Sequence, residues 1–406
     1  MAHPLFMKKI PSPSFRSQNT PFSPIRKFVP LLEKVKKEGV KVYELHIGQP
    51  DLETPLQIRK KIKGFSEERL SYTPSPGTSR LRKAWQKYYQ TMGLSLDVSE
   101  IIATIGGSEA IFFAFSAVCD AGEELIVFEP FYTTYNSYAA MTDIKLKPVT
   151  TKAETGFHLP DRKEIEKRVS KKTRGIIVCN PNNPTGTVYS KKELRMVTDI
   201  ARKNNLFIIS DETYRGFVYD GEEHCSIMEV PGAKSRAILL DSVSKGFSAC
   251  GARIGCLVSK NKEIITAVTK FSQARLSLPM VEQEAVVPLL ENPKKYIQKI
   301  VPEYRKRRDA AFKGLKEIPG IECLKPKGAF YVIVGLPVKD AEHFVKWMLT
   351  EFRLKGETVM LSPASGFYAT PKLGKNEVRV AFVLSPKKIT KAMKILKRAL
   401  EEYQNV

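Results

Sequence analysis

A lysine among small residues is the side chain of this sequence best placed for covalent chemistry. Lys245 lies in residues 242–255, directly after a short apolar run, and Ser242 and Ser244 precede it. Burial and nearby cations lower the pKa of a lysine, and its neutral amine can then condense with an aldehyde. The hydroxyl group of Ser242 and the guanidinium of Arg253 suit a doubly charged phosphate. A lysine imine beside a phosphate site indicates pyridoxal 5'-phosphate, although most single lysines after a strand are surface residues.

A carboxylate and a helix start supply two further features that this cofactor requires. Its pyridine nitrogen must stay protonated, which takes a buried anion. Asp211 follows an apolar run, where a carboxylate is costly unless it is paired, although Asp after a strand is also a common helix N-cap. Gly107, Ser108 and Glu109 begin a predicted helix, whose free amide groups favour phosphate, as an ordinary capped helix also would. The Glu109 side chain would repel phosphate, so we expect only its backbone to contribute.

Residues 242–255 resemble, position for position, the cofactor-attachment segment of the class I aminotransferases, which depend on pyridoxal 5'-phosphate. The resemblance runs from about residue 23 to the C-terminus. It rests on the ordered spacing of Gly48, Tyr72, Tyr132, Asn183, Asp211, Lys245, Arg253 and Arg379. Within the family, the chain is most similar to bacterial and archaeal aspartate aminotransferase-like proteins.

The resemblance implies contacts to the cofactor ring. Asp211 and Tyr214 match the family's Asp-x-x-Tyr motif, in which the aspartate pairs with the ring nitrogen and the tyrosine contacts the ring oxygen. Residues 180–186 resemble the family's Asn-Pro-Thr-Gly loop, which implies that Asn183 donates a hydrogen bond to the phenolic oxygen. Asn, Pro and Gly are turn residues in any case. Tyr132 stands where the family places an aromatic side chain on the pyridine face, although a core tyrosine is the alternative.

The resemblance also implies a homodimer with shared active sites, because Tyr72 matches the tyrosine that reaches the phosphate of the neighbouring subunit. The catalytic residues that it implies are Lys245, Asp211 and Tyr214. The implied cofactor-binding residues are Tyr72, Gly107, Ser108, Glu109, Tyr132, Asn183, Asp211, Tyr214, Ser242, Ser244, Lys245 and Arg253.

Two arginines are candidates for binding carboxylates of the substrate. Arg379 lies alone in an apolar strand, where it needs a partner, and a structural ion pair would satisfy it. The resemblance implies instead that Arg379 clamps the substrate α-carboxylate, beside Asn183 and with Gly48 leaving room for the substrate. Arg275 follows a helix in a region that can supply an arginine to the partner's site in aspartate-type relatives. We expect it to bind the side-chain carboxylate there, and a surface or interface arginine is the alternative.

These residues predict an aminotransferase that moves an amino group from an L-amino acid, aspartate or glutamate, to a 2-oxo acid. Aminotransferases for alanine or aromatic amino acids, and a β-lyase of the same fold, need the same electron sink and stay open as alternatives. A cofactor-binding regulator that binds DNA would carry a separate domain. About twenty residues precede the resemblance, which is too few for one, so we expect no nucleic-acid partner.

The elements that must position these residues predict an α/β fold. Short apolar strands alternate with helical stretches, which indicates a mostly parallel sheet sandwiched by helices, and every motif lies at a strand end. From about residue 293 the pattern changes to a smaller α+β domain. We therefore predict an N-terminal arm with part of the small domain over 1–47, a large cofactor-binding domain over 48–292 and a small C-terminal domain over 293–406.

Composition and charge fit a protein without a membrane span. The 406 residues are 42% hydrophobic, and no apolar run is long enough to cross a bilayer. The formal net charge of +23 is spread along the chain, which favours solvated faces over a nucleic-acid site. Six scattered cysteines without a CxxC pair argue against a zinc site or disulfides and for a reducing, cytoplasmic location. The first 32 residues hold five basic residues and no acid, which favours a flexible arm over a transit peptide.

Overall fold

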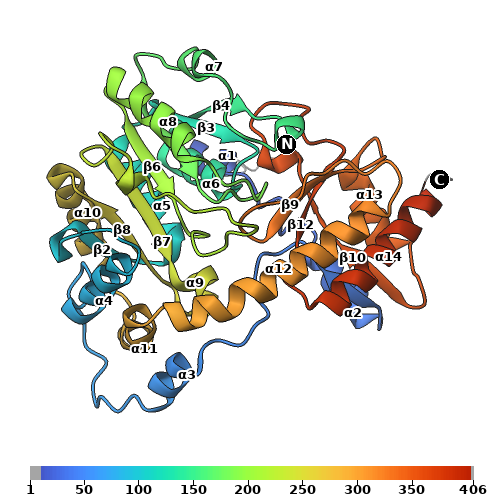
Figure 1. The fold of residues 1–406 in the computed structure, drawn as a ribbon, viewed down its shortest axis with the longest axis horizontal. Coiled ribbons are helices and arrows are strands. Elements are labelled where there is room, and N and C mark those ends of the chain that lie inside the picture. The colour runs from blue at the N-terminus through green and yellow to red at the C-terminus, as the bar shows by residue number, and fades with distance from the viewer. Residues whose placement is uncertain (1–10, 404–406) are drawn as a thin grey trace, which may run out of the picture.

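The computed structural model describes residues 11–403 of the chain (Figure 1). The first ten residues, which belong to the predicted N-terminal arm and include two of its basic residues, lie outside the described part.

A seven-stranded sheet forms the centre of the larger part of the molecule. Its strand order is β2-β8-β7-β6-β5-β3-β4; β8 pairs antiparallel with β2 and β7, and all other adjacent pairs are parallel. The strands are β2 (Ile101–Ile105), β3 (Glu124–Glu129), β4 (Lys145–Thr150), β5 (Thr173–Cys179), β6 (Phe207–Asp211), β7 (Ala237–Ser242) and β8 (Ile254–Ser259). The five central strands are almost entirely buried, as expected for strands covered on both faces. The predicted mostly parallel sheet is therefore present.

Helices cover both faces of this sheet (Figure 1). Successive residues of a strand point to opposite faces, so Ile176 and Val178 belong to one hydrophobic cluster and Ile177 to the other. The first cluster includes residues of α4 (Ser79–Gln90), α8 (Lys191–Lys203) and α11 (Met280–Glu291), and the second includes residues of α5 (Gly106–Val118), α6 (Thr134–Thr142) and α10 (Lys262–Arg275). The shorter helices are α3 (Leu56–Lys63), α7 (Arg162–Glu166) and α9 (Val243–Gly246).

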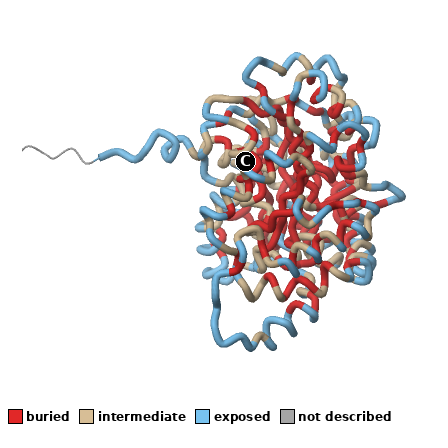
Figure 2. The backbone as a smooth tube through the Cα atoms, turned by 90° about the vertical axis from the view of Figure 1, so that its left-hand side faces the viewer, coloured by how far each residue is buried: buried red, intermediate tan, exposed pale blue. Residues whose placement is uncertain are grey.

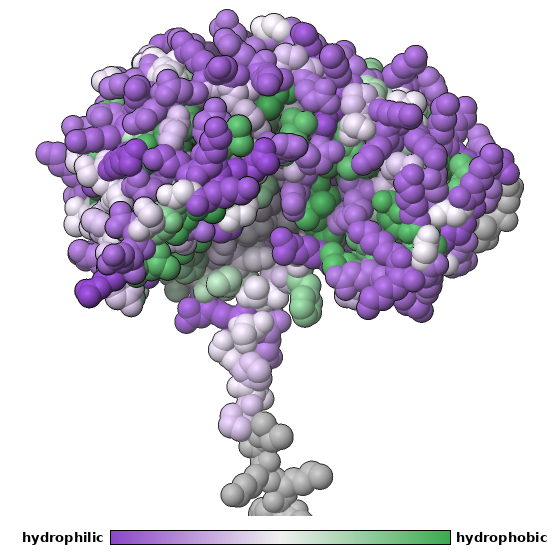
Figure 3. Space-filling model, turned by 90° about the horizontal axis from the view of Figure 1, so that it is seen from below, coloured by the Kyte–Doolittle hydropathy of each residue, from purple (hydrophilic) through white to green (hydrophobic). Residues whose placement is uncertain are grey.

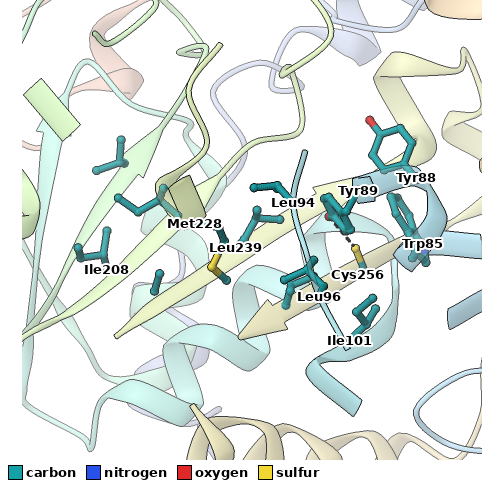
Figure 4. Close-up of a cluster of buried hydrophobic side chains, with 14 of the residues drawn as sticks. Trp85, Tyr88, Tyr89, Leu94, Leu96, Ile101, Ile208, Met228, Leu239 and Cys256 are labelled. Carbon is teal, nitrogen blue, oxygen red and sulfur yellow. Dashed lines mark hydrogen bonds between the residues drawn. The ribbon is translucent and has the colours of Figure 1, made fainter. Parts of the chain in front are cut away.

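Aromatic side chains of α4 pack against the sheet beside strand β8 (Figure 4). Trp85 stacks on Tyr89 with ring centroids 5.9 Å apart, and the hydroxyl group of Tyr89 lies 3.3 Å from Sγ of Cys256. Cys256 belongs to β8, which directly follows Arg253. The packing of α4 therefore helps to fix the strand that positions this arginine.

The smaller part of the molecule contains two further sheets. β1 (Lys41–Glu44) pairs in parallel with β10 (Glu357–Met360), while β11 (Ser362–Pro363), β12 (Glu377–Ala381) and β9 (Tyr331–Gly335) form an antiparallel sheet. The surrounding helices are α2 (Val29–Lys37), α12 (Lys294–Lys316), α13 (Ala341–Thr350) and α14 (Pro386–Tyr403), and a separate hydrophobic cluster packs this part. β1 thus joins N-terminal residues to the C-terminal part, and we propose residues 48 and 293 as the domain limits.

The N-terminal residues that the structure describes are exposed, and most of the surface is hydrophilic. Residues of α1 (Phe15–Asn19) and most of those around it are exposed (Figure 2). Hydrophilic side chains cover most of the face in Figure 3, and apolar ones gather around a hollow at its centre. Within residues 11–403, no helix is long and apolar enough to cross a membrane, and no group of three or more His, Cys, Asp or Glu side chains could hold a metal ion.

Candidate active site

A pocket of about 740 Å³ lies where β5, β6 and β7 end, beyond the carboxyl ends of parallel strands. Twelve of the predicted site residues line it together: Gly48, Gly107, Ser108, Tyr132, Asn183, Asp211, Tyr214, Ser242, Ser244, Lys245, Arg253 and Arg379. Tyr72, Glu109 and Arg275 are the predicted residues that do not line it. The fold therefore gathers residues that lie more than 300 positions apart in the sequence, Gly48 and Arg379.

Lys245 brings its amine into this pocket from the one-turn helix α9. Its Nζ donates a hydrogen bond to the backbone oxygen of Gly48 at 2.6 Å and lies 3.8 Å from Sγ of Cys250. Burial lowers the pKa of Lys245, and the positive charges of Arg379 and Arg253 act in the same direction. A larger fraction of the amine is therefore neutral, which is the form that attacks an aldehyde carbon.

Asp211 ends β6 as a buried carboxylate. Its Oδ2 accepts a hydrogen bond from the hydroxyl group of Tyr135 at 2.9 Å, and its Oδ1 accepts from the hydroxyl group of Thr213 at 2.8 Å. Burial raises the pKa of Asp211 against these hydrogen bonds. Within the described residues Asp211 has no ion-pair partner, and a cation beside it would offset the cost of burying its charge. A protonated ring nitrogen fits that requirement.

The start of α5 and the two ends of residues 242–253 form a polar cradle. Ser242 Oγ donates to Ser244 Oγ at 2.7 Å, and a guanidinium N–H of Arg253 donates to the backbone oxygen of Cys250 at 2.9 Å. Arg253 also sits close to the start of α5: a Cβ on Gly106 would lie 2.4 Å from Nη2 of Arg253. Hydroxyl groups, an arginine and helix amide groups are the donors that a phosphate requires, so the donor set fits that of pyridoxal 5'-phosphate.

Arg379 is a buried cation that the protein only partly satisfies. One Nη donates to Oδ1 of Asn183 at 3.0 Å and the other to the backbone oxygen of His46 at 2.7 Å. Its Nε has no hydrogen-bond partner, and the described residues offer it no carboxylate. The guanidinium lies 4.3 Å from the ring centroid of Tyr331 and 5.0 Å from that of Phe367. A carboxylate ligand would supply the missing anion.

Tyr214 lies in the same wall of the pocket. Its hydroxyl oxygen is 2.8 Å from that of Tyr331, and burial raises the pKa of Tyr214. Tyr132 also faces the pocket, with its ring edge-on to Tyr135 at a centroid distance of 5.6 Å.

Three predicted residues lie outside the pocket of their own chain. Glu109 accepts a hydrogen bond from the amide of Ile105 at 2.8 Å and forms an ion pair with Arg275 at 3.4 Å. Arg275 also donates to the backbone oxygen of Ser75 at 2.7 Å. Tyr72 is 81% exposed. The structure thus pairs Glu109 with Arg275 outside the pocket. The roles predicted for Tyr72, Glu109 and Arg275 remain predictions.

Comparison with known proteins agrees with this arrangement. Residues 40–396 match the family model described as aminotransferase class I and II. The chain belongs to this aminotransferase family.

Relatives of this aminotransferase cover nearly the whole chain. An aspartate aminotransferase of Pyrococcus horikoshii is 32% identical over 367 residues, which are 89% of this chain and 91% of that protein. An aromatic-amino-acid aminotransferase of Thermococcus litoralis is 31% identical over 94% of this chain and 96% of its own length. The solved structure of the Thermus thermophilus aspartate aminotransferase with maleate has a TM-score of 0.87 at 28% identity and covers 96% of this chain and 100% of its own.

These comparisons confirm the predicted family, the fold-type I α/β architecture and pyridoxal 5'-phosphate as the cofactor. The protein is an aminotransferase that depends on this cofactor.

The sequence did not predict several residues that line the pocket of this aminotransferase or support its lining residues. Tyr135 and Tyr331 contact Asp211 and Tyr214 from distant elements, and only the fold shows these pairs. Thr213 could have been found, because it lies inside the motif that marked Asp211 and Tyr214. The lining residues that were not predicted also include Ser23, Arg26 and Cys250.

Proposed function

We propose that this aminotransferase moves an amino group between aspartate or glutamate and a 2-oxo acid such as 2-oxoglutarate. The observation that carries the proposal is one pocket that holds both a partly buried lysine amine, on Lys245, and a buried guanidinium without an anion, on Arg379. The named specificity of the Pyrococcus horikoshii relative supports the choice of donor.

Each wall residue has a distinct part in the proposed reaction. Bound pyridoxal 5'-phosphate supplies the electron sink that stabilises negative charge at the substrate Cα. Lys245 Nζ takes the proton from that carbon, because burial favours the neutral amine. Arg379, held by Asn183 and the backbone of His46, binds the α-carboxylate and so orients the Cα–H bond toward the amine. Asp211 holds the positive charge of the ring nitrogen.

The other predicted lining residues would hold the cofactor. Ser242, Ser244, Arg253 and the start of α5 bind the phosphate in this proposal, and Tyr214 and Asn183 contact the ring oxygen. Tyr132 would lie against the ring face.

A homodimer in the cytoplasm completes the proposal. Leu70 is 74% exposed and Tyr72 81%, and both lie in a segment that a second copy could cover. All six cysteines are free thiols, which is typical of a reducing compartment.

A second candidate is an aminotransferase for alanine or aromatic amino acids. Ile25, Ile111 and Tyr132 give the pocket apolar lining, and the Thermococcus litoralis relative is named for aromatic substrates. A solved Pyrococcus furiosus structure, 30% identical with a TM-score of 0.87, is named as an alanine aminotransferase.

One experiment separates these candidates. The purified holoenzyme is mixed with single amino acids without an oxo acid, and the change in cofactor absorbance is followed for each donor. Fast conversion by aspartate and glutamate supports the proposal, whereas faster conversion by alanine or phenylalanine supports the second candidate. Release of ammonia and pyruvate without an acceptor would identify a β-lyase instead.

A further inference from the structure

The N-terminal segment contributes a cation to the wall of the active-site pocket. Ser23, Ile25 and Arg26 line the pocket, although they precede every strand and lie just before α2. Among the described residues, the Arg26 side chain forms no hydrogen bond or ion pair. It is therefore an exposed guanidinium at a ligand pocket with no protein partner.

The backbone that precedes Arg26 is anchored. A Cβ on Gly366 would lie 2.5 Å from Cβ of Pro24, so the two residues are in close contact. Ile25 packs against the cluster that contains Phe367, whereas the ion pair of Lys27 with Glu342 of α13 is partly exposed and contributes little to this anchoring. Such fixed neighbours hold the backbone of Arg26 at the pocket while its side chain remains free to meet a ligand.

The same turn supports both Arg26 and the substrate clamp. Phe367 lies 5.0 Å from the guanidinium of Arg379, and it belongs to the cluster on which Ile25 packs. The N-terminal segment and Arg379 therefore belong to one continuous wall. Arg26 and Arg379 both line the pocket beside this wall.

The charges in the pocket leave one cation for a second carboxylate. The lining contains four basic residues, Arg26, Lys245, Arg253 and Arg379. Lys245 is bonded to the backbone of Gly48, Arg253 to that of Cys250, and Arg379 to Asn183 and His46. The one acidic lining residue is Asp211, at the end of β6. Arg26 is the basic lining residue whose side chain has no hydrogen-bond or ion-pair partner among the described residues.

We propose that Arg26 binds the side-chain carboxylate of dicarboxylic substrates and thereby determines the preference of the enzyme for acidic donors. This inference rests on the proposed function, because it assumes that Arg379 takes the α-carboxylate. Pairing between a guanidinium and a carboxylate is charge-assisted and can use two parallel hydrogen bonds. A monocarboxylic donor leaves the Arg26 guanidinium to water.

The sequence analysis predicts a different residue, Arg275, for binding the side-chain carboxylate. Its guanidinium already has a carboxylate partner in Glu109 and a backbone partner at Ser75. Binding a substrate carboxylate would require Arg275 to give up or share the charge of Glu109. Arg26 carries no such cost, which favours it as the residue that reads the side chain.

The test compares Arg26→Gln with Lys27→Gln, which removes the same charge from the next residue. Lys27 is bound to Glu342 and does not line the pocket, so it controls for the general field of a protein with a net charge of +23. For each holoenzyme, the rate constant of cofactor conversion is measured with L-aspartate and with L-alanine. We expect Arg26→Gln to lower the aspartate-to-alanine ratio about tenfold to a hundredfold, as loss of a charge-assisted pair does.

Two additional variants sharpen the result. Arg26→Lys keeps the charge but loses the planar fork, and it should recover part of the ratio. Arg275→Leu should leave the ratio at its wild-type value. The inference is overturned if Arg26→Gln keeps the wild-type ratio, if Lys27→Gln lowers it equally, or if Arg275→Leu alone lowers it.

Binding of unreactive acids gives a readout that does not depend on turnover. Succinate and propionate differ by one carboxylate, and each is titrated into the holoenzyme by calorimetry. Arg26→Gln should weaken succinate binding relative to propionate, and it should reduce the dependence of succinate affinity on salt. An unchanged succinate-to-propionate ratio overturns the inference. Failure of the proposed function is a different result, since the wild-type enzyme itself would then convert its cofactor no faster with aspartate or glutamate than with alanine or phenylalanine.

Discussion

The hydroxyl group of Tyr331 occupies the space that a side chain on Gly48 would need. A Cβ on Gly48 would lie 1.6 Å from Oη of Tyr331 and 2.5 Å from the ring carbon that carries it. Tyr331 Oη also lies 2.8 Å from Tyr214 Oη, and the backbone oxygen of Gly48 accepts the hydrogen bond of Lys245. Because residue 48 is a glycine, its backbone can lie against Tyr331, the partner of Tyr214, and still accept the hydrogen bond of Lys245.

Gly48→Ala should damage the site by forcing these two elements apart. Overpacking of this kind costs about 1–3 kcal/mol of stability, and a displaced Tyr331 also loses its contact with Tyr214. Thermal unfolding and the conversion rate with aspartate both report the change. The double variant Gly48→Ala with Tyr331→Phe should recover part of the lost stability, because the closest atom is gone. No recovery in the double variant would show that the tyrosine hydroxyl is not the cause.

Lys245→Ala should abolish turnover but retain the cofactor. The cradle of Ser242, Ser244 and Arg253 is intact in this variant, so the phosphate is still bound. Loss of a positioned base alone lowers a rate by about 10²–10⁴-fold, and this residue also supplies the covalent attachment. Turnover is measured with saturating aspartate, and cofactor content by absorbance after gel filtration. Transamination near the wild-type rate in the loaded variant would show that another amine does the chemistry.

Asp211→Ala should be nearly inactive even when it is loaded with cofactor. The variant leaves the ring nitrogen without an anion, and removal of one such electrostatic partner typically costs about 10²–10³ in rate. Asp211→Glu keeps the charge and should lose much less. Conversion rates of the two loaded variants are compared at equal cofactor content. Equal activity in the two variants would contradict the contact between Asp211 and the ring nitrogen.

Local sequence patterns predicted those parts of the site that depend on short motifs. Lys245, Asp211 and the start of α5 all lie at strand ends, where an apolar run gives way to small or polar residues. The alternation of such runs with helical stretches predicted the mostly parallel sheet, because buried strands and amphipathic helices have distinct periods. The apolar run over 329–334 is typical of a strand, but β9 begins only at Tyr331, because Ala329 has a φ of 52°, outside the extended region.

Long-range contacts could not be predicted from the sequence. The hydrogen bond from Tyr135 to Asp211 joins residues of α6 and β6, and no spacing in the chain announces it. The position of Arg26 in the pocket also depends on a long-range contact, because Pro24 packs against Gly366. Assembly of the dimer likewise depends on a second copy of the chain.

The shared active site can be tested with a mixed dimer. In the proposed dimer, Tyr72 serves the cofactor of the other subunit, and its 81% exposure leaves it free to do so. A Tyr72→Phe chain paired with a Lys245→Ala chain then places both lesions in one site and leaves the other intact. The hybrid, purified with two different tags, should have about half the wild-type activity per dimer, since a two-fold dimer has two equivalent sites.

Each variant alone is the control, and Lys245→Ala should be inactive. If Tyr72 acted within its own chain, the hybrid would show no more than half the activity of the Tyr72→Phe homodimer. A fully active monomer in sedimentation experiments would exclude sharing altogether.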